Sequence, residues 1–214
     1  MELLRQIGNA LGMRNIPEGM EDRVPPGQYV TPKMPVMNMG FVPKVPVETW
    51  TLQVFGQVEE PVELDWEGFL ALAQQTETVD FHCVTQWSRL NVGWEGVPAG
   101  VVLDLARPKP DARFVMLHCA DGYTTNLALD AVRAPDALFA HRRDGAPLEA
   151  AHGAPVRLVV PARYGWKSAK WVTGVELLTD DAPGFWEQNG YHMRGDPWAE
   201  ERFARAQPLA HSPA

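Results

Sequence analysis

One of only two cysteines in this 214-residue chain, Cys83, lies in the strand-like segment DFHCVTQWS, residues 80–88. Polar residues, among them Thr85 and Ser88, follow it directly. A lone cysteine is most often a small buried residue, whereas its thiolate is a nucleophile or a ligand for soft transition metals. Packing is the commoner explanation of such a segment taken alone, but the polar end of the strand favours a metal-binding or catalytic site. Cys119 lies inside an apolar run and is expected to be structural.

A second group of reactive residues lies in HGAPVRLVVPARYGWKSAK, residues 152–170. Its loop carries four residues that suit a phosphate, through backbone amides near glycine, a hydroxyl and two ammonium groups: Gly165, Lys167, Ser168 and Lys170. Arg157, on the preceding strand, could add a bidentate contact. The segment matches neither the P-loop nor the GxGxxG pattern. An anion site and a solvated basic loop are therefore weighted equally.

The C-terminal segment gathers aromatic and cationic residues within thirteen positions: Trp186, Tyr191, His192, Arg194 and Trp198. Such a group commonly covers a hydrophobic core. It could also form one wall of a pocket, in which Tyr191 donates a hydrogen bond and His192 or Arg194 supplies a cation.

Short strands and short helices must position these groups. Alternation and turn residues predict strands over 49–58, 62–64, 78–88, 112–123, 137–148, 154–161 and 170–178, with an Asp-Gly hairpin turn in the fifth. Helices are predicted over 66–75, 97–108 and 127–135, the first capped by Asp65, with a last helical turn at 199–203. Because there is no regular βαβ alternation, the pattern indicates an α+β fold with mixed sheets.

Residues 16–48 are rich in proline and methionine and cannot form a long helix or a central strand. Either a flexible linker or an extended arm packed across the core explains them, and their apolar side chains favour the arm. The first fifteen residues predict a short amphipathic helix. We therefore expect a helix and linker over 1–28, a single domain over 29–203 and a tail over 204–214.

Composition excludes several classes of protein. The net charge is -8 and there is no long basic run, so nucleic acid and anionic lipid are not expected partners. Two cysteines cannot build a disulfide framework, and no paired Cys and His pattern indicates zinc. No apolar run approaches a membrane span of roughly 18 residues. The chain shows no signal peptide or twin arginine, which predicts a cytoplasmic protein, or a periplasmic one if a leader was removed.

Three segments together resemble one family, in the family's order over roughly residues 30–195. FHCVTQWS with the following WEGV is similar to the molybdenum-ligating segment of the sulfite oxidase superfamily. HGAPVRLVVPARYGWKSAKWV resembles that superfamily's pterin-phosphate segment, and FWEQNGYH its tail. The nearest likeness is to the small stand-alone form of the oxidoreductase molybdopterin-binding domain, to which the catalytic subunit of periplasmic methionine sulfoxide reductase belongs.

The resemblance implies a sulfite oxidase-type fold and a Mo-molybdopterin cofactor with a single pyranopterin dithiolene. It assigns Cys83 as the metal ligand and Tyr191 as a residue beside the metal. It also assigns cofactor contacts to Asn38, Met39, His152, Arg157, Ser168, Ala169 and Lys170. No haem domain is expected in this chain, and a monomer is expected.

The departures from the family concern the substrate. Positions that hold arginines in sulfite oxidases read Met37 and Ser88, and only Arg89 is near enough to compensate. Burying a sulfite dianion without cations is costly, so sulfite is disfavoured. The methionine sulfoxide reductases carry glutamate where this chain has Thr85. The substrate pocket is expected to be lined by Thr85, Ser88, Arg89 and His192.

The leading hypothesis is oxygen-atom transfer at molybdenum, either reducing an S-oxide or N-oxide or oxidising a sulfite-type substrate. Electrons would pass through an external haem protein or quinone-linked carrier, since no haem, flavin or iron–sulfur signature is present. A non-catalytic molybdopterin-binding or carrier protein is the alternative. A thiol enzyme with Cys83 as nucleophile is a third hypothesis, but neighbouring strand residues point to opposite faces, so His82 is a poor base.

Overall fold

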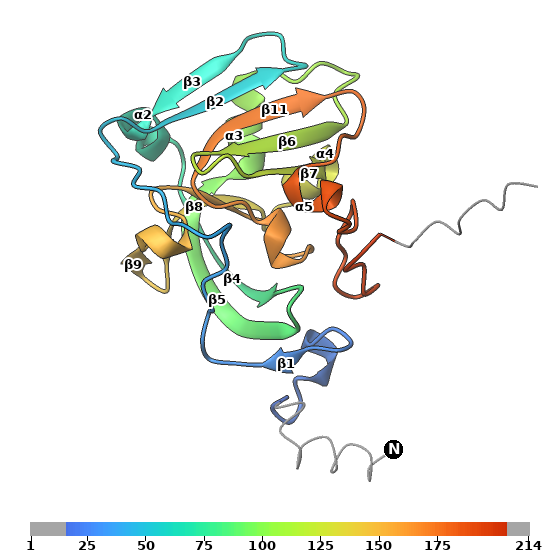
Figure 1. The fold of residues 1–214 in the computed structure, drawn as a ribbon. Coiled ribbons are helices and arrows are strands. Elements are labelled where there is room, and N and C mark those ends of the chain that lie inside the picture. Colours follow the sequence, from blue (N-terminus) through green and yellow to red (C-terminus); the bar gives the residue numbers. More distant parts are fainter. Residues whose placement is uncertain (1–15, 205–214) are drawn as a thin grey trace, which may run out of the picture.

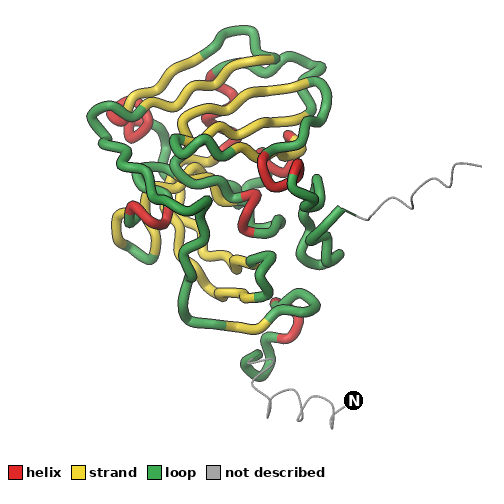
Figure 2. The backbone as a smooth tube through the Cα atoms, in the orientation of Figure 1, coloured by secondary structure: helices red, strands yellow, loops and turns green. Residues whose placement is uncertain are grey.

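The computed structural model describes residues 16–204. Two β-sheets form the body of the molecule, and the helices that connect their strands are short (Figures 1 and 2). One sheet has five strands in the order β3-β2-β11-β6-β7, and the other has six, with a path β1-β5-β8-β10 to which β4 and β9 attach. The predicted α+β class with mixed sheets is confirmed, since β11 pairs in parallel with β2 and antiparallel with β6.

The five-stranded sheet contains β2 (Thr51–Gly56), β3 (Val62–Asp65), β6 (Phe114–Cys119), β7 (Thr124–Ala128) and β11 (Val172–Leu178). Four of these strands follow the sequence prediction, and Leu52 and Val54 alternate inward as expected. β7 was missed: its residues pair with β6, so the predicted helix over 127–135 is reduced to α4 (Leu129–Val132).

The six-stranded sheet contains β1 (Tyr29–Val30), β4 (Gln75–His82), β5 (Trp87–Pro98), β8 (Leu138–Arg143), β9 (Ala146–Pro147) and β10 (Arg157–Val159). The predicted single strand over 78–88 is wrong, because a turn after His82 divides it between the antiparallel strands β4 and β5. The Asp-Gly turn between β8 and β9 is confirmed. Asp144 and Gly145 both have positive φ, 50° and 78°, which a tight hairpin requires.

The helices are shorter than predicted. α2 (Trp66–Ala71) begins at the predicted cap, where the Asp65 side chain accepts a hydrogen bond from the Gly68 amide at 2.8 Å. α3 (Ala99–Leu105) occupies only the middle of its predicted range, and α5 (Phe185–Gln188) was not predicted. Residues 16–204 also form three 3₁₀ turns, namely η1 (Glu21–Arg23), η2 (Ala150–His152) and η3 (Gly165–Lys167). Residues 199–203 form no helix. None of the helices within 16–204 has the length and apolar character that a bilayer span demands.

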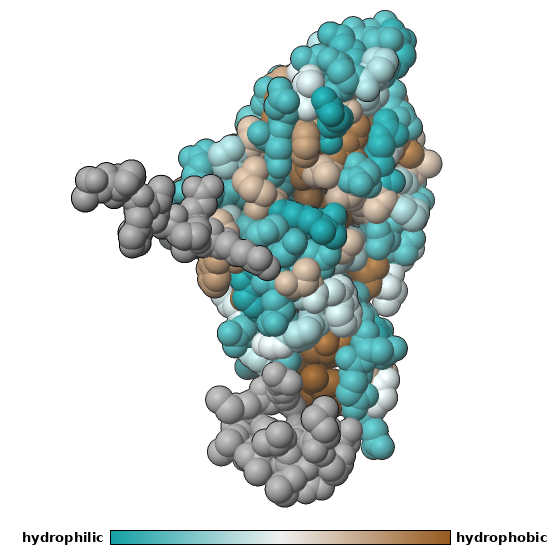
Figure 3. All heavy atoms as spheres, turned by 90° about the vertical axis from the view of Figure 1, so that its right-hand side faces the viewer, coloured by the Kyte–Doolittle hydropathy of each residue, from teal (hydrophilic) through white to brown (hydrophobic). Residues whose placement is uncertain are grey.

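The main hydrophobic core lies between the two sheets, because Leu52 and Val175 of one and Val97, Phe139 and Leu158 of the other belong to the same buried cluster. A smaller cluster gathers around Trp94, Phe81 and Leu138. On the face of the molecule seen in Figure 3, exposed apolar residues lie between hydrophilic ones. Phe81 at the end of β4 and Val159 of β10 both belong to the smaller cluster.

The proline-rich segment is an extended arm, as predicted. Its β1 pairs in parallel with β5, Met34 packs on the smaller cluster, and Met39 and Val45 pack on the main one. In Figure 1 the arm crosses the molecule from β1 toward β2. The predicted N-terminal helix lies outside the described residues.

Candidate active site

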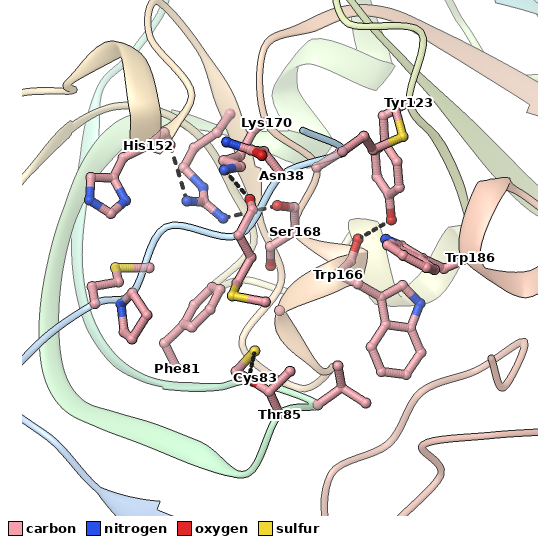
Figure 4. A pocket seen from close by; sticks show the side chains of 18 of the residues that line it. Asn38, Phe81, Cys83, Thr85, Tyr123, His152, Trp166, Ser168, Lys170 and Trp186 are labelled. Carbon is pink, nitrogen blue, oxygen red and sulfur yellow. Dashed lines mark hydrogen bonds between the residues drawn. The ribbon is translucent and has the colours of Figure 1, made fainter. Parts of the chain in front are cut away.

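A cavity lies where the arm, the turn after β4, the loop after β10 and the C-terminal segment meet (Figure 4). About 880 Å³ in and around it is free of protein atoms, and part of this space is open solvent. Its lining includes ten of the residues predicted to contact the metal, the cofactor or the substrate: Asn38, Met39, Cys83, Thr85, His152, Arg157, Ser168, Ala169, Lys170 and Tyr191. Positions more than 150 residues apart in the sequence thus meet at one site.

Cys83 stands at the start of a tight turn that joins β4 to β5. Its amide donates to the Trp87 carbonyl at 2.8 Å, and its own carbonyl accepts from the Gln86 amide at 3.1 Å. Its Sγ lies 3.1 Å from Thr85 Oγ1. Only 6% of the residue is exposed, and this burial raises the pKa of the thiol, although the Thr85 hydroxyl opposes the shift. A buried thiolate here needs a compensating cation such as a metal ion.

Both ends of the chain hold this turn. The buried Gln28 side chain donates from Nε2 to the Cys83 carbonyl at 2.9 Å. From the other end, Arg202 donates from Nη1 to the Val84 carbonyl at 2.6 Å and lies 4.9 Å from the ring centroid of Tyr164. The Cys83 backbone is therefore fixed on two sides.

Arg157 is a buried cation without a carboxylate partner. Its guanidinium donates to the His152 carbonyl at 3.1 Å and the Ser168 carbonyl at 2.9 Å, and packs on the Trp94 ring at 5.0 Å. Among residues 16–204 no carboxylate lies within ion-pair distance of it. Burial first, and then the nearby Arg143, lower its pKa to about 9. Such a guanidinium is stabilised by any anion that enters the cavity.

Lys170 and His152 lie on the same side of the cavity. Lys170 Nζ donates to the Ala151 carbonyl at 3.0 Å and to the Met37 carbonyl, which ties it to the arm. Burial and the charge of Arg157 lower its pKa to about 8. Burial also lowers the pKa of His152 to about 4, so its imidazole is neutral near pH 7. Lys170 likewise has no ion-pair partner in the described part of the chain.

These residues fit a cofactor that joins a phosphate to a soft metal. Two unneutralised cations and the Ser168 backbone face one part of the cavity, and a single thiol faces another (Figure 4). Thiolate is a ligand for soft metals, and paired cations with backbone amides bind phosphate. His152 is buried as a neutral hydrogen-bonding group, in keeping with its predicted contact to the cofactor.

An aromatic wall closes the side formed by the C-terminal segment. Tyr191 stacks on Trp186 with centroids 4.9 Å apart and meets the Trp166 ring edge-on at 5.1 Å. Trp166 is itself held, because its indole donates to Glu187 Oε1 at 2.7 Å and its carbonyl accepts from the Tyr123 hydroxyl at 2.7 Å.

Lys167 does not belong to the cavity, contrary to its predicted place in a phosphate loop. Its Nζ lies 2.6 Å from Glu187 Oε1, and both side chains are fully buried. It also donates to the Asn126 side chain at 2.7 Å. The loop turns inward at η3, so Lys167 points into the protein while Ser168 and Lys170 face the cavity.

Three residues predicted to line the substrate pocket do not line this cavity, namely Ser88, Arg89 and His192. Ser88 is fully buried and its Oγ lies 2.8 Å from Nδ1 of His82. Arg89 is paired with Asp144 at 2.5 Å. The His192 Nδ1 accepts from the Arg194 amide at 3.1 Å instead of facing the pocket. Arg194, the other candidate cation, is half-exposed and pairs with Asp196.

Several lining residues were missed by reasoning from the sequence. Trp166, Phe81 and Met34 carried no signal beyond general hydrophobicity, because packing alone decides which side they face. Asp121 and Tyr123 follow an apolar strand at an Asp-Gly turn, and that position was the available clue. Asp121 lies near enough to Lys170 to oppose the lowering of its pKa.

Comparison with known proteins agrees with the resemblance noted in the sequence. Residues 39–186, more than half of the chain, match the oxidoreductase molybdopterin binding domain. The uncharacterized oxidoreductase YuiH of Bacillus subtilis (strain 168) is 47% identical over 182 residues, which are 85% of this chain and 92% of that protein. The protein-methionine-sulfoxide reductase catalytic subunit MsrP of Gluconobacter oxydans (strain 621H) is 32% identical over 69% of this chain and 54% of its own length. The chain thus spans about half of that subunit.

A solved structure shows the same fold. The sulfane dehydrogenase SoxCD from Paracoccus pantotrophus superposes with a TM-score of 0.62 over 70% of this chain and 42% of that chain, at 23% identity. The resemblance noted in the sequence is therefore confirmed by a family match, by relatives and by a fold. The chain belongs to the oxidoreductase molybdopterin binding domain family and is a sulfite oxidase-type enzyme with a Mo-molybdopterin cofactor.

Proposed function

We propose that this chain catalyses two-electron oxygen-atom transfer at a mononuclear molybdenum ion held by one pyranopterin dithiolene and by the thiolate of Cys83. The observation that carries the proposal is the shared cavity, in which the buried thiol of Cys83 and the unpaired cations Arg157 and Lys170 line one space. Cys119 is buried outside this lining and serves as an internal comparison.

The residues of the cation side hold the cofactor and take no part in the chemistry. Arg157 and Lys170 would neutralise its phosphate, while the Ser168 and Ala169 backbone, His152 and Asn38 would orient the pterin. Ordering these side chains costs little on binding, because backbone carbonyls already fix Arg157 and Lys170. When bound, the cofactor supplies the two-electron redox chemistry and the transferable oxygen atom.

The residues around Cys83 shape the reacting end. Cys83 would hold the metal through its thiolate, and the Thr85 hydroxyl, 3.1 Å from the sulfur, would donate to it and stabilise the thiolate. Tyr191 lines the same cavity, and its hydroxyl would donate a hydrogen bond to the substrate oxygen. Burial raises the pKa of Tyr191, so this hydroxyl stays protonated at neutral pH. Trp166 and Trp186 exclude water from the site.

Electrons enter or leave through an external carrier, a haem protein or a quinone-linked protein. Support comes from relatives whose names describe them as subunits of protein-methionine-sulfoxide reductases. The names of those relatives also describe them as sulfoxide reductases. For this chain, sulfoxide reduction is one form of the proposed reaction.

A thiol enzyme is disfavoured by the surroundings of Cys83. His82 points to the opposite face of the strand from Cys83, and its Nδ1 is hydrogen-bonded with Ser88 Oγ. Burial lowers the pKa of His82 to about 4. No imidazole lines the Cys83 end of the cavity among the described residues, so a nucleophilic cysteine would lack its base.

The test compares the wild type with Cys83→Ser and Cys119→Ser after expression in a host that makes molybdopterin. Molybdenum, pterin and oxygen-atom transfer are measured on each purified protein. We expect near-stoichiometric metal and turnover in the wild type and in Cys119→Ser, and loss of turnover in Cys83→Ser. Wild-type protein without molybdenum, or full turnover in Cys83→Ser, would contradict the proposal.

A further inference from the structure

We infer that Glu187, which lies outside the cavity lining, is a positioning residue for the reacting end of the cavity. Its buried carboxylate fixes the aromatic wall, and the wall in turn sets the place of the Tyr191 hydroxyl. The inference rests on the proposed function, which assigns that hydroxyl to the substrate oxygen. It is carried by the hydrogen bonds that meet at one oxygen atom of Glu187.

The Glu187 carboxylate joins three segments of the chain at its Oε1 atom. Oε1 accepts from the Trp166 indole at 2.7 Å and lies 2.6 Å from Lys167 Nζ. It also accepts from the Thr125 hydroxyl at 3.2 Å. Trp166 and Lys167 belong to η3 and Thr125 to β7, whereas Glu187 belongs to α5. Because the Glu187 and Lys167 side chains are fully buried, these bonds form in a low dielectric, where they are stronger than in water.

The helix that carries Glu187 depends on such contacts for its place. α5 (Phe185–Gln188) is a single turn, and its N-cap residue, Gly184, makes no side-chain cap. A helix this short has little stability of its own. Gly184 lies so close to β7 that a Cβ there would be 2.5 Å from the Thr125 Cα. The start of α5 is thus set by its contact with β7, and the Glu187 carboxylate bonds the helix to η3.

Glu187 thereby holds both tryptophans that contact Tyr191. Trp166 is held through its indole N–H, and Trp186 is the neighbour of Glu187 in α5. The Tyr191 ring stacks on Trp186 with 23° between the planes and meets Trp166 at 83°. Figure 4 shows the two indoles together on one side of the cavity, with the Trp166 carbonyl bonded to Tyr123. A shift of either indole would therefore move the Tyr191 ring.

The Tyr191 hydroxyl is placed by ring packing. Among residues 16–204 it makes no hydrogen bond, and its ring contacts Trp166, Trp186 and Phe203. Phe203 is 60% exposed, so it confines the ring less than the indoles do. The two indoles held by Glu187 are thus the contacts that fix the direction of the hydroxyl.

The charges of the buried pair are not needed for this role. An apolar pair of the same volume is commonly as stable as a buried ion pair. An apolar side chain at position 187, however, supplies no acceptor for the Trp166 indole. An uncharged residue that keeps an acceptor oxygen should therefore retain the position of the wall, and an apolar one of the same size should lose it.

The test compares two double variants that both lack the buried charges. The first, Lys167→Met/Glu187→Gln, keeps an amide oxygen that accepts from Trp166, and the second, Lys167→Met/Glu187→Met, has nearly the same size without it. Each protein is labelled with meta-fluorotyrosine, and the fluorine NMR resonance of Tyr191 is assigned with Tyr191→Phe. We expect this resonance to match the wild type in the first variant and to shift or broaden in the second. A wild-type resonance in the folded second variant, or in Lys167→Met/Glu187→Leu if the second does not fold, would overturn the inference.

Turnover links the wall to the reaction. With dimethyl sulfoxide as oxygen donor and reduced methyl viologen as reductant, kcat of the loaded second variant should be about tenfold or more below that of the first, because a displaced donor no longer reaches the reacting oxygen. The difference should disappear when both variants also carry Tyr191→Phe. A difference undiminished by Tyr191→Phe would contradict the route through Tyr191. The fluorine NMR requires no molybdenum, so wild-type protein without the metal would contradict the proposed function alone, and the Tyr191 resonance would still decide the inference.

Discussion

The Arg202 guanidinium donates to the Val84 carbonyl at 2.6 Å, and this bond ties the end of the domain to the turn that carries Cys83. The residue that follows Cys83, the proposed metal ligand, is thus fixed by a side chain 118 positions away. The cysteine turn depends on this C-terminal contact as well as on its own backbone bonds.

Removing this contact tests how firmly the turn is held. Arg202→Ala leaves the Val84 carbonyl without its donor, so we expect the free energy of unfolding to fall by about 1–3 kcal/mol. Molybdenum retention after dialysis should fall with it. Arg194→Ala removes an exposed ion pair and should change stability by less than about 1 kcal/mol. Equal effects in urea unfolding of the two variants would show that Arg202 has no special role.

The buried pair of Lys167 and Glu187 makes a second prediction. Lys167→Met leaves the Glu187 carboxylate buried without its cation, which should destabilise the protein by about 3–5 kcal/mol. Removing both charges in Lys167→Met/Glu187→Leu should restore part of that loss, because no charge is then buried. Denaturant unfolding of both variants measures this. A double variant less stable than Lys167→Met would show that the pair acts through its hydrogen bonds to Trp166 and Asn126.

Anion binding by cofactor-free protein should depend on pH through Lys170. Its pKa is lowered to about 8 by burial, the charge of Arg157 adding to the effect while Asp121 opposes it. Lys170 is cationic below that value and loses its charge as the pH rises through it. Affinity for pyrophosphate, measured by calorimetry, should therefore be highest below pH 8 and fall above it.

The lowered pKa of Lys170 also makes the stability of the unliganded protein depend on pH. The folded pKa lies below the ordinary value of 10.5, so the unfolded chain binds more protons between pH 8 and 10.5. The free energy of unfolding should accordingly rise with pH over this window. Lys170→Met should flatten both profiles, and a variant with unchanged profiles would contradict the assignment.

Gly165 tests the close packing beneath the cavity. A Cβ at this position would lie 2.5 Å from the Phe81 ring, so Gly165→Ala should displace that ring and cost about 1–3 kcal/mol. Gly100, in α3, has no neighbour within 4 Å of the corresponding Cβ. Gly100→Ala should leave stability unchanged or raise it by up to about 1 kcal/mol. Thermal unfolding in parallel decides between these outcomes, and a neutral Gly165→Ala would refute the predicted clash.

Local signals in the sequence predicted most strands and the segments that form the site, because periodicity, caps and Asp-Gly turns act over a few residues. β5 and β7 were missed because their pairing with distant strands outweighs their own mixed composition. The cavity residues found from the resemblance, from Asn38 to Lys170, do line one cavity. Ser88, Arg89 and Lys167 do not line it, because their direction depends on partners, His82, Asp144 and Glu187, that no local pattern reveals.

The central claim, that Cys83 ligates molybdenum, is tested most directly by X-ray absorption at the molybdenum edge of the loaded enzyme. The account predicts sulfur scattering from the two dithiolene sulfurs and one further sulfur in the wild type and in Cys119→Ser. Cys83→Ser, provided that it retains metal, should lose that one sulfur and gain an oxygen or nitrogen scatterer. Identical sulfur scattering in wild type and Cys83→Ser would contradict the account.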